Sequence, residues 1–147
     1  MIQKALLLTA LMVVVPVASA ADLTGRAIYR PISSESVDFS DGRVLSRSTV
    51  IGFVSGDGAD NPFDTRTQNC YSVSMRTPGS DVVEQFGHCD ALDKEEDLFV
   101  LNFHNDTWEI AGGTGKFAGM KGGGTTKVIQ TWSDGSYLIT WTGKTSK

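Results

Sequence analysis

Turn-forming residues recur at short intervals along this chain, and this spacing restricts its fold more than any other feature. Between the turns, apolar and polar residues alternate, which is typical of β-strands because successive side chains of a strand point to opposite faces. No stretch after residue 20 has the 3.6-residue apolar period of a helix. The turn signals are Asp41–Gly42, Gly56–Asp57–Gly58, Pro78–Gly79–Ser80, Asn105–Asp106, 112–124 and Asp134–Gly135.

The segments between these turns predict eight strands. Eight antiparallel strands can close into a small up-and-down barrel, and closure removes the sheet edges along which chains aggregate. We therefore expect an all-β fold, an eight-stranded antiparallel up-and-down β-barrel. The expected strands are 22–30, 43–55, 67–77, 82–90, 97–104, 107–112, 124–132 and 136–143.

The N-terminal segment has a composition of its own. Lys4 is followed by an apolar run at 5–15, and Ala18–Ser19–Ala20 has the small residues of a cleavage site, an order typical of a secretory signal peptide. A membrane anchor is the alternative, but it needs about 17–25 apolar residues. We expect a signal peptide at 1–20, one barrel domain at 21–147, and export to the periplasm or the cell exterior.

Charge and cysteine usage narrow the class of protein. The 147 residues include 17 acidic and 13 basic side chains without a run of Lys or Arg, which disfavours nucleic acid as a partner. The only two cysteines, Cys70 and Cys89, lie in a chain predicted to be exported, where oxidation is the default. We expect a structural disulfide between them, because a redox-active pair favours the closer Cys-x-x-Cys spacing.

Three hairpins fix a predicted register. A two-residue turn at Asp134–Gly135 sets Trp132 opposite Tyr137, Gln130 opposite Ile139 and Val128 opposite Trp141. A turn at Asn105–Asp106 sets Phe103 opposite Trp108 and Leu101 opposite Ile110. A four-residue loop around Pro78–Gly79 sets Val73 opposite Phe86, Tyr71 opposite His88 and Cys70 opposite Cys89, which is within reach of a disulfide.

Strict alternation then divides the hairpin residues between two faces. The aromatic-rich set is predicted to fill the barrel interior, and the polar set, with the disulfide among it, to face solvent. A polar exterior argues against an outer-membrane barrel and integral membrane association. The predicted interior residues are Tyr71, Val73, Met75, Val82, Phe86, Phe99, Leu101, Phe103, Trp108, Ile110, Val128, Trp132, Tyr137, Ile139 and Trp141.

Three polar side chains, Glu84, His88 and Gln130, fall on the predicted inner face. They could orient a ligand in an apolar cavity, or they could lie hydrogen-bonded or wet near the barrel mouth, which is the interpretation we favour. The candidate ligand-binding residues combine these three with the interior aromatics. They are Tyr71, Glu84, Phe86, His88, Phe103, Trp108, Gln130, Trp132, Tyr137 and Trp141.

No pattern of catalytic or metal-binding residues stands out. The acidic segment 90–97 has irregular spacing, is interrupted by Lys94 and contains no Gly, so a solvated loop is favoured over a calcium loop. His88 and His104 are separate in the sequence and do not make a zinc site without carboxylates that we cannot place. We assign no catalytic residue, metal or cofactor.

The segment 112–124 is rich in glycine but is not a phosphate-binding loop. The Walker A pattern requires Gly and Ser or Thr where Ile110 and Phe117 stand, and no βαβ unit surrounds the segment. It favours a glycine-kinked connection that adopts positive φ between two strands. Its structural glycines are Gly112, Gly113, Gly115 and Gly119.

The same segment carries a family resemblance. Gly-Gly-Thr-Gly-Lys-Phe at 112–117, following Trp108-Glu-Ile, resembles a segment of dirigent proteins and of the allene oxide cyclase barrel superfamily. It is also similar to small exported bacterial proteins of unknown role that carry this segment behind a Cys…Cys-Asp stretch. The match covers 108–124. It implies an eight-stranded barrel with a hydrophobic cavity, but no position here matches the catalytic carboxylates or arginines of the plant families.

These observations lead to one functional hypothesis and two alternatives. The hypothesis is an exported barrel that binds a small hydrophobic molecule in an aromatic-lined cavity, without a cofactor. The first alternative is a cyclase or isomerase in which His88 or Glu84 polarises a substrate in the same cavity. The second is a secreted structural or interaction domain with a packed core, since an eight-stranded barrel can be filled by side chains or hold one small ligand.

Overall fold

The computed structural model describes residues 21–58, 61–63, 66–93 and 95–147, so the predicted signal peptide lies outside the described residues. Among the described residues, no helix is long and apolar enough to cross a membrane. The described chain forms eight strands and one short 3₁₀-helix, η1 (Gly115–Phe117). The strands are β1 (Ala21–Asp38), β2 (Val44–Gly56), β3 (Arg66–Arg76), β4 (Val83–Leu92), β5 (Leu98–His104), β6 (Thr107–Gly113), β7 (Lys121–Thr131) and β8 (Tyr137–Ser146).

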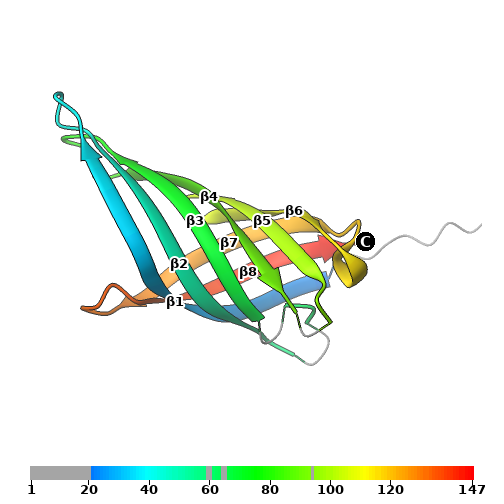
Figure 1. Cartoon of the computed structure of the whole chain (residues 1–147). Coiled ribbons are helices and arrows are strands. Elements are labelled where there is room, and N and C mark those ends of the chain that lie inside the picture. The colour runs from blue at the N-terminus through cyan, green and yellow to red at the C-terminus, as the bar shows by residue number, and fades with distance from the viewer. Residues whose placement is uncertain (1–20, 59–60, 64–65, 94) are drawn as a thin grey trace, which may run out of the picture.

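Each strand pairs antiparallel with its neighbours in sequence, and β8 pairs with β1 to close the barrel (Figure 1). The predicted eight-stranded antiparallel barrel is therefore confirmed. One end of the barrel carries the hairpin turns. The other end carries the longer connections, η1, the start of β1 and the end of β8 (Figure 1).

Strand β1 is much longer than the predicted segment 22–30, because it continues to Asp38. With β2 it forms a hairpin that extends beyond the rest of the barrel (Figure 1). Pro31 lies in this strand, where the pairing of β1 with β2 shifts between Pro31 and Ser33. A proline in a strand is tolerated at such an irregularity because the ladder there does not need its missing N–H group.

Two of the three predicted registers are confirmed. Strands β3 and β4 pair Cys70 with Cys89 and Tyr71 with His88, and the two cysteines form the expected disulfide. Strands β5 and β6 pair Leu101 with Ile110 and Phe103 with Trp108. In both hairpins, the register predicted from the turn residues is the register of the structure.

The predicted register of β7 and β8 is wrong. Tyr137 pairs with Thr131, and Ile139 pairs with Val128 across an irregularity, so Trp132 belongs to the turn. The Gly135 N–H donates to the Trp132 carbonyl and the Trp132 N–H donates to the Ser136 carbonyl, while Gly135 has a φ of 81°. This is a type I turn followed by a left-handed glycine, one residue longer than the two-residue turn that Asp-Gly predicts.

The predicted faces of β3 and β4 are also reversed. Cys70 and Cys89 are each only 5% exposed and lie in the interior, whereas Tyr71 is 44% and Phe86 53% exposed. The prediction gave the interior to the bulkier side chains, but a small barrel has to alternate large and small residues in its limited interior. Cys70, Ser72 and Gly87 are the small residues that face the interior from β3 and β4, and the Phe103 ring lies over Gly87.

Candidate functional site: a cavity in the open half of the barrel

Aromatic rings fill the end of the barrel that carries the long connections. Phe63, from the β2–β3 connection, lies at the centre of this cluster, with its ring centroid 4.6 Å from that of Phe99. The rings of Trp108, Phe117 and Trp141 surround Phe63 at centroid distances of 6.0–6.3 Å. Phe99 and Phe117 have almost no exposed surface. These rings form the floor of the barrel interior.

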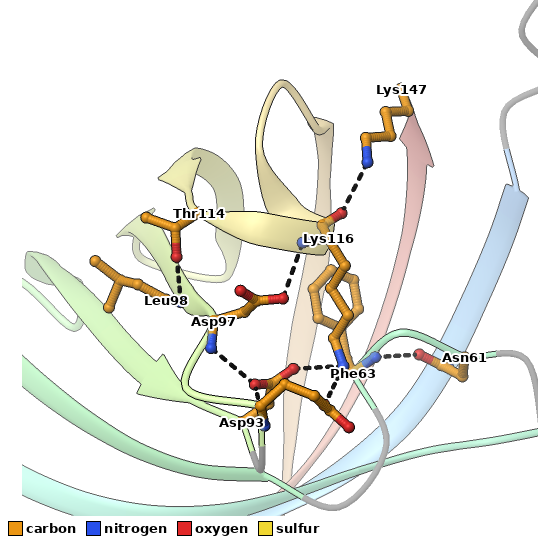
Figure 2. A network of polar contacts seen from close by, with 9 residues as sticks. Asn61, Phe63, Asp93, Asp97, Leu98, Thr114, Lys116 and Lys147 are labelled. Atoms are coloured by element: carbon orange, nitrogen blue, oxygen red, sulfur yellow. Dashed lines mark hydrogen bonds and ion pairs between the residues drawn. The ribbon is translucent and has the colours of Figure 1, made fainter.

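The glycine-rich segment positions Phe117 in this floor. The Thr114 hydroxyl accepts a hydrogen bond of 2.8 Å from the Leu98 N–H, and the Lys116 N–H donates to Asp97 at 2.9 Å (Figure 2). Gly115 has a φ of 48°, and a β-carbon there would overlap the Asp97 carboxylate. Gly115 and Gly119 have the positive φ expected of the structural glycines. The expectation is wrong for Gly112 and Gly113, which do not have a positive φ. Gly113 nevertheless packs against Phe117, whereas a β-carbon at Gly112 would meet nothing within 4 Å.

The acidic segment closes over the same floor. The Lys116 ammonium pairs with Asp93 and, at 3.2 Å, with Glu95 (Figure 2). Asp93 also accepts hydrogen bonds of 2.9 Å from the N–H groups of Glu95 and Asp97. The hydrogen bond from Lys116, followed by those from the backbone, lowers the pKa of Asp93 to about 2. The described acidic residues therefore hold a connection in place, and no group of three metal-ligating side chains occurs in the described chain.

Above this floor, the barrel interior contains a cavity of about 520 Å³. The cavity extends to the end of the barrel that carries the hairpins, because Ser34 and Ser48 of the β1–β2 hairpin and Asn105 of the β5–β6 turn line it. The β1–β2 hairpin extends furthest at that end (Figure 1). Its wall includes the disulfide and side chains from every strand. The apolar and aromatic lining residues include Tyr29, Val50, Val54, Leu101, Phe103, Val128, Tyr137 and Ile139, with Phe63, Phe99, Trp108 and Trp141 from the floor.

The cavity lining carries no charge. Among the described residues, no Asp, Glu, His, Lys or Arg lines it, and its polar groups are hydroxyls and amides. Most of these polar groups come from the hairpin ends of the strands and form a polar rim, while Gln68 lies deeper, beside the aromatic rings. The rim residues are Ser33, Ser34, Ser48, Ser72, Gln85, Asn105 and Thr131.

A buried polar pair lies on the cavity wall. The Tyr29 hydroxyl donates a hydrogen bond of 2.8 Å to Gln68 Oε1, and the Tyr29 ring stacks on Tyr137 with 5.3 Å between centroids. Gly52 pairs with both Tyr29 and Gln68 in the sheet, and the Tyr29 ring occupies the space that a side chain at Gly52 would need. Burial raises the pKa of both tyrosines above the ordinary value of 10, so both phenols stay protonated.

The structure divides the predicted ligand-binding residues between the cavity and the outside of the barrel. The interior position predicted for four of them is confirmed, because these four line the cavity; ligand binding by them stays a prediction. They are Phe103, Trp108, Tyr137 and Trp141.

The interior position predicted for the other six is wrong. The exposed rings of Tyr71 and His88 stack on each other at 5.1 Å, and Glu84 Oε1 lies 3.7 Å from His104 Nε2. The Gln130 amide donates to the carbonyl of Thr131, and Trp132 is 43% exposed. The six residues absent from the cavity lining are Tyr71, Glu84, Phe86, His88, Gln130 and Trp132.

Sequence reasoning missed Tyr29 and Gln68. The signal for Tyr29 was present, because Leu23, Gly25, Ala27 and Tyr29 occupy every second position along 22–30. The positions between them are polar except for Ile28. Gln68 is a polar residue on the face that carries Cys70, and that face was assigned to solvent. Placing the disulfide inside would have brought Gln68 inside as well.

No protein-family model and no curated protein sequence matches this chain. Among solved structures, it is similar to two pterocarpan synthase dirigent proteins, GePTS1 and PsPTS1. The superposition on GePTS1 has a TM-score of 0.56 and 11% identity, over 88% of this chain and 85% of that one. For PsPTS1 the TM-score is 0.54 and the identity 10%, over 87% of this chain and 95% of that one.

The chain has the dirigent-type barrel fold. This confirms the fold that the resemblance at 108–124 implied. An identity of 10–11% establishes the fold alone, so the activity named for those two proteins is not carried over to this chain.

Proposed function

We propose that this protein binds a small, uncharged and mainly apolar molecule inside its barrel. The observation that carries the proposal is the open cavity of about 520 Å³. Its described lining is mainly apolar and aromatic, its other polar groups are uncharged hydroxyls and amides, and the two tyrosines are its only ionisable groups. Ligand pockets are typically of about 300–1,000 Å³, mostly apolar, with a few polar groups that fix orientation. A charged ligand would lose its hydration here without gaining a counter-charge.

The two alternatives have less support. A domain with a fully packed core would not contain a cavity of this volume. In this barrel, aromatic rings fill only the floor of the interior. The cyclase or isomerase hypothesis relied on His88 or Glu84, and neither side chain lines the cavity. No other imidazole or carboxylate of the described chain lines the cavity in their place.

We also propose that the protein is exported and acts in the periplasm or outside the cell. The disulfide between Cys70 and Cys89 supports this location, because disulfides persist mainly in oxidising compartments. The signal-peptide pattern at 1–20 supports it independently.

A matched pair of variants tests ligand binding. Ser72 lines the cavity, so Ser72→Trp places an indole in the proposed binding volume, whereas Asn102→Trp adds the same group on the outer face of β5. We expect the neutral fluorophore N-phenyl-1-naphthylamine to bind the wild type and Asn102→Trp equally, and Ser72→Trp at least tenfold more weakly. Circular dichroism checks that both variants are folded.

No binding to the wild type, or equal binding to all three proteins, would count against the proposal. In the first case the interior does not accept a ligand of this size. In the second the fluorophore binds elsewhere on the surface.

A further inference from the structure

We propose that the Gln68 carboxamide is the polar anchor of the cavity and selects ligands that carry a carbonyl oxygen. This inference rests on the proposed ligand-binding function and adds the chemical class of the ligand. Gln68 lines the cavity although it is only 4% exposed. A polar side chain so deeply buried normally has every hydrogen-bonding group paired.

Only one end of the Gln68 carboxamide is paired. Its oxygen Oε1 accepts the hydrogen bond of 2.8 Å from the Tyr29 hydroxyl. Its nitrogen Nε2 donates to no residue that the structure describes. Nε2 is not fully buried, because it keeps accessible surface where Gln68 lines the cavity. A bound ligand displaces water from this donor, so a ligand that supplies an acceptor gains affinity relative to one that leaves the donor unpaired.

The wall around Gln68 fixes the direction in which the amide faces. The Tyr29 ring crosses the bare backbone of Gly52 and is held against Tyr137 by stacking. Tyr29 thereby occupies the oxygen side of the carboxamide, which leaves the N–H₂ side for the cavity. Tyr29 acts as a positioning residue, since it orients the donor without being the donor.

The chemistry of the donor defines the ligand class. An N–H₂ group pairs with a carbonyl oxygen, which has two acceptor lone pairs, and a neutral carbonyl does not bring a charge into the uncharged cavity. The rings and aliphatic side chains around Gln68 suit the apolar remainder of the ligand. We therefore infer a ketone, ester or similar carbonyl compound with an aromatic or alicyclic body.

Two probes of nearly equal size test this selection. 2-Acetylnaphthalene carries a carbonyl group and 2-ethylnaphthalene does not, and their dissociation constants are measured by quenching of tryptophan fluorescence. We expect Gln68→Met, which keeps the length of the side chain but removes the amide, to lower the affinity for the ketone relative to the hydrocarbon about tenfold. Gln130→Met, which makes the same substitution at a residue outside the cavity, serves as the control and should leave the ratio unchanged.

The carbonyl stretching frequency gives a second readout on the wild type itself. The stretch of bound 2-acetylnaphthalene should lie below its value in hexane, and Gln68→Met should abolish the shift, whereas Gln130→Met should retain it. Tyr29→Phe should weaken the shift because the amide loses its fixed orientation.

The outcomes separate this inference from the proposed function. If neither probe binds, the proposed function fails and the anchor fails with it. If both bind but the ratio of affinities is the same in wild type and Gln68→Met, the cavity binds ligands and the anchor alone is overturned. An unshifted carbonyl stretch in the wild type overturns the anchor as well.

Discussion

The hydroxyl of Tyr29 on β1 reaches Gln68 on β3 with a buried hydrogen bond of 2.8 Å, although strand β2 lies between them. The contact is possible because the residue of β2 paired with both is Gly52, whose missing side chain leaves room for the phenol ring. A cross-strand pair of a large ring and a glycine is one way to fill a small barrel without overfilling it.

Gly52 should therefore tolerate no side chain. A β-carbon there overlaps the Tyr29 ring, so Gly52→Ala should lower the free energy of unfolding by about 1–3 kcal/mol, as overpacking typically does. Gly112→Ala is the control, because a β-carbon at Gly112 meets nothing within 4 Å. Urea denaturation of both variants checks the prediction, and equal stability of the two would contradict it.

Loss of the disulfide should destabilise the barrel. Cys70 and Cys89 are 19 residues apart, and a cross-link that closes a loop of this size contributes about 3 kcal/mol by restricting the unfolded chain. The double variant Cys70→Ala, Cys89→Ala should lose about this much in urea denaturation and should no longer respond to a reductant. A double variant as stable as the oxidised wild type would show that the cross-link is dispensable.

The ion pair between Asp93 and Lys116 should make stability depend on pH in the acid range. The pKa of Asp93 is about 2 in the folded protein, below the ordinary 3.8, so its contribution is present above pH 4 and is lost as the pH falls toward 2. Asp93→Asn should therefore be less stable than the wild type at pH 7, and the difference should shrink toward pH 2. Chemical denaturation at several pH values measures it.

Asp81→Asn provides the comparison for this titration. Asp81 is exposed and makes no hydrogen bond or ion pair with any described residue, so its replacement should leave stability at pH 7 unchanged. A difference between wild type and Asp93→Asn that stays constant down to pH 2 would argue against the ion pair as its source.

The outer-face aromatics should have no part in ligand binding. His88 stacks on Tyr71 outside the cavity, so His88→Ala should change the affinity for N-phenyl-1-naphthylamine by less than twofold. Leu101→Ala, at a position that lines the cavity, provides the contrast and should change it several-fold. Fluorescence titration measures both, and a large loss in His88→Ala would move the binding site to the outer face.

Local signals predicted the barrel well. The turns at Pro78–Gly79 and Asn105–Asp106 carry enough information to pair Cys70 with Cys89 and Phe103 with Trp108. Asp134–Gly135 led to the wrong register, because a glycine with positive φ is compatible with two turns. One is a two-residue turn, and the other is a type I turn that is one residue longer. That single residue moved the predicted partner of Tyr137 from Thr131 to Trp132.

The cavity was less predictable than the fold, because a register does not say which face of a hairpin points inward. Both faces of β3 and β4 carry apolar side chains, and the outward set that contains Tyr71 and Phe86 is the bulkier one. The choice is made by the other strands of the barrel, where Tyr29 of β1, Phe103 of β5 and Tyr137 of β8 already occupy the interior. Such long-range volume matching has no local signal in the sequence.

The most direct test of a ligand-binding interior is a ¹H–¹⁵N NMR titration with 2-acetylnaphthalene. The indole N–H signals of Trp108 and Trp141, together with the side-chain amide of Gln68, report on the cavity, whereas the exposed indole of Trp132 reports on the surface. We predict that the first three signals shift on titration while that of Trp132 stays in place. A titration that shifts the Trp132 indole and leaves Trp108, Trp141 and Gln68 unchanged would contradict the account.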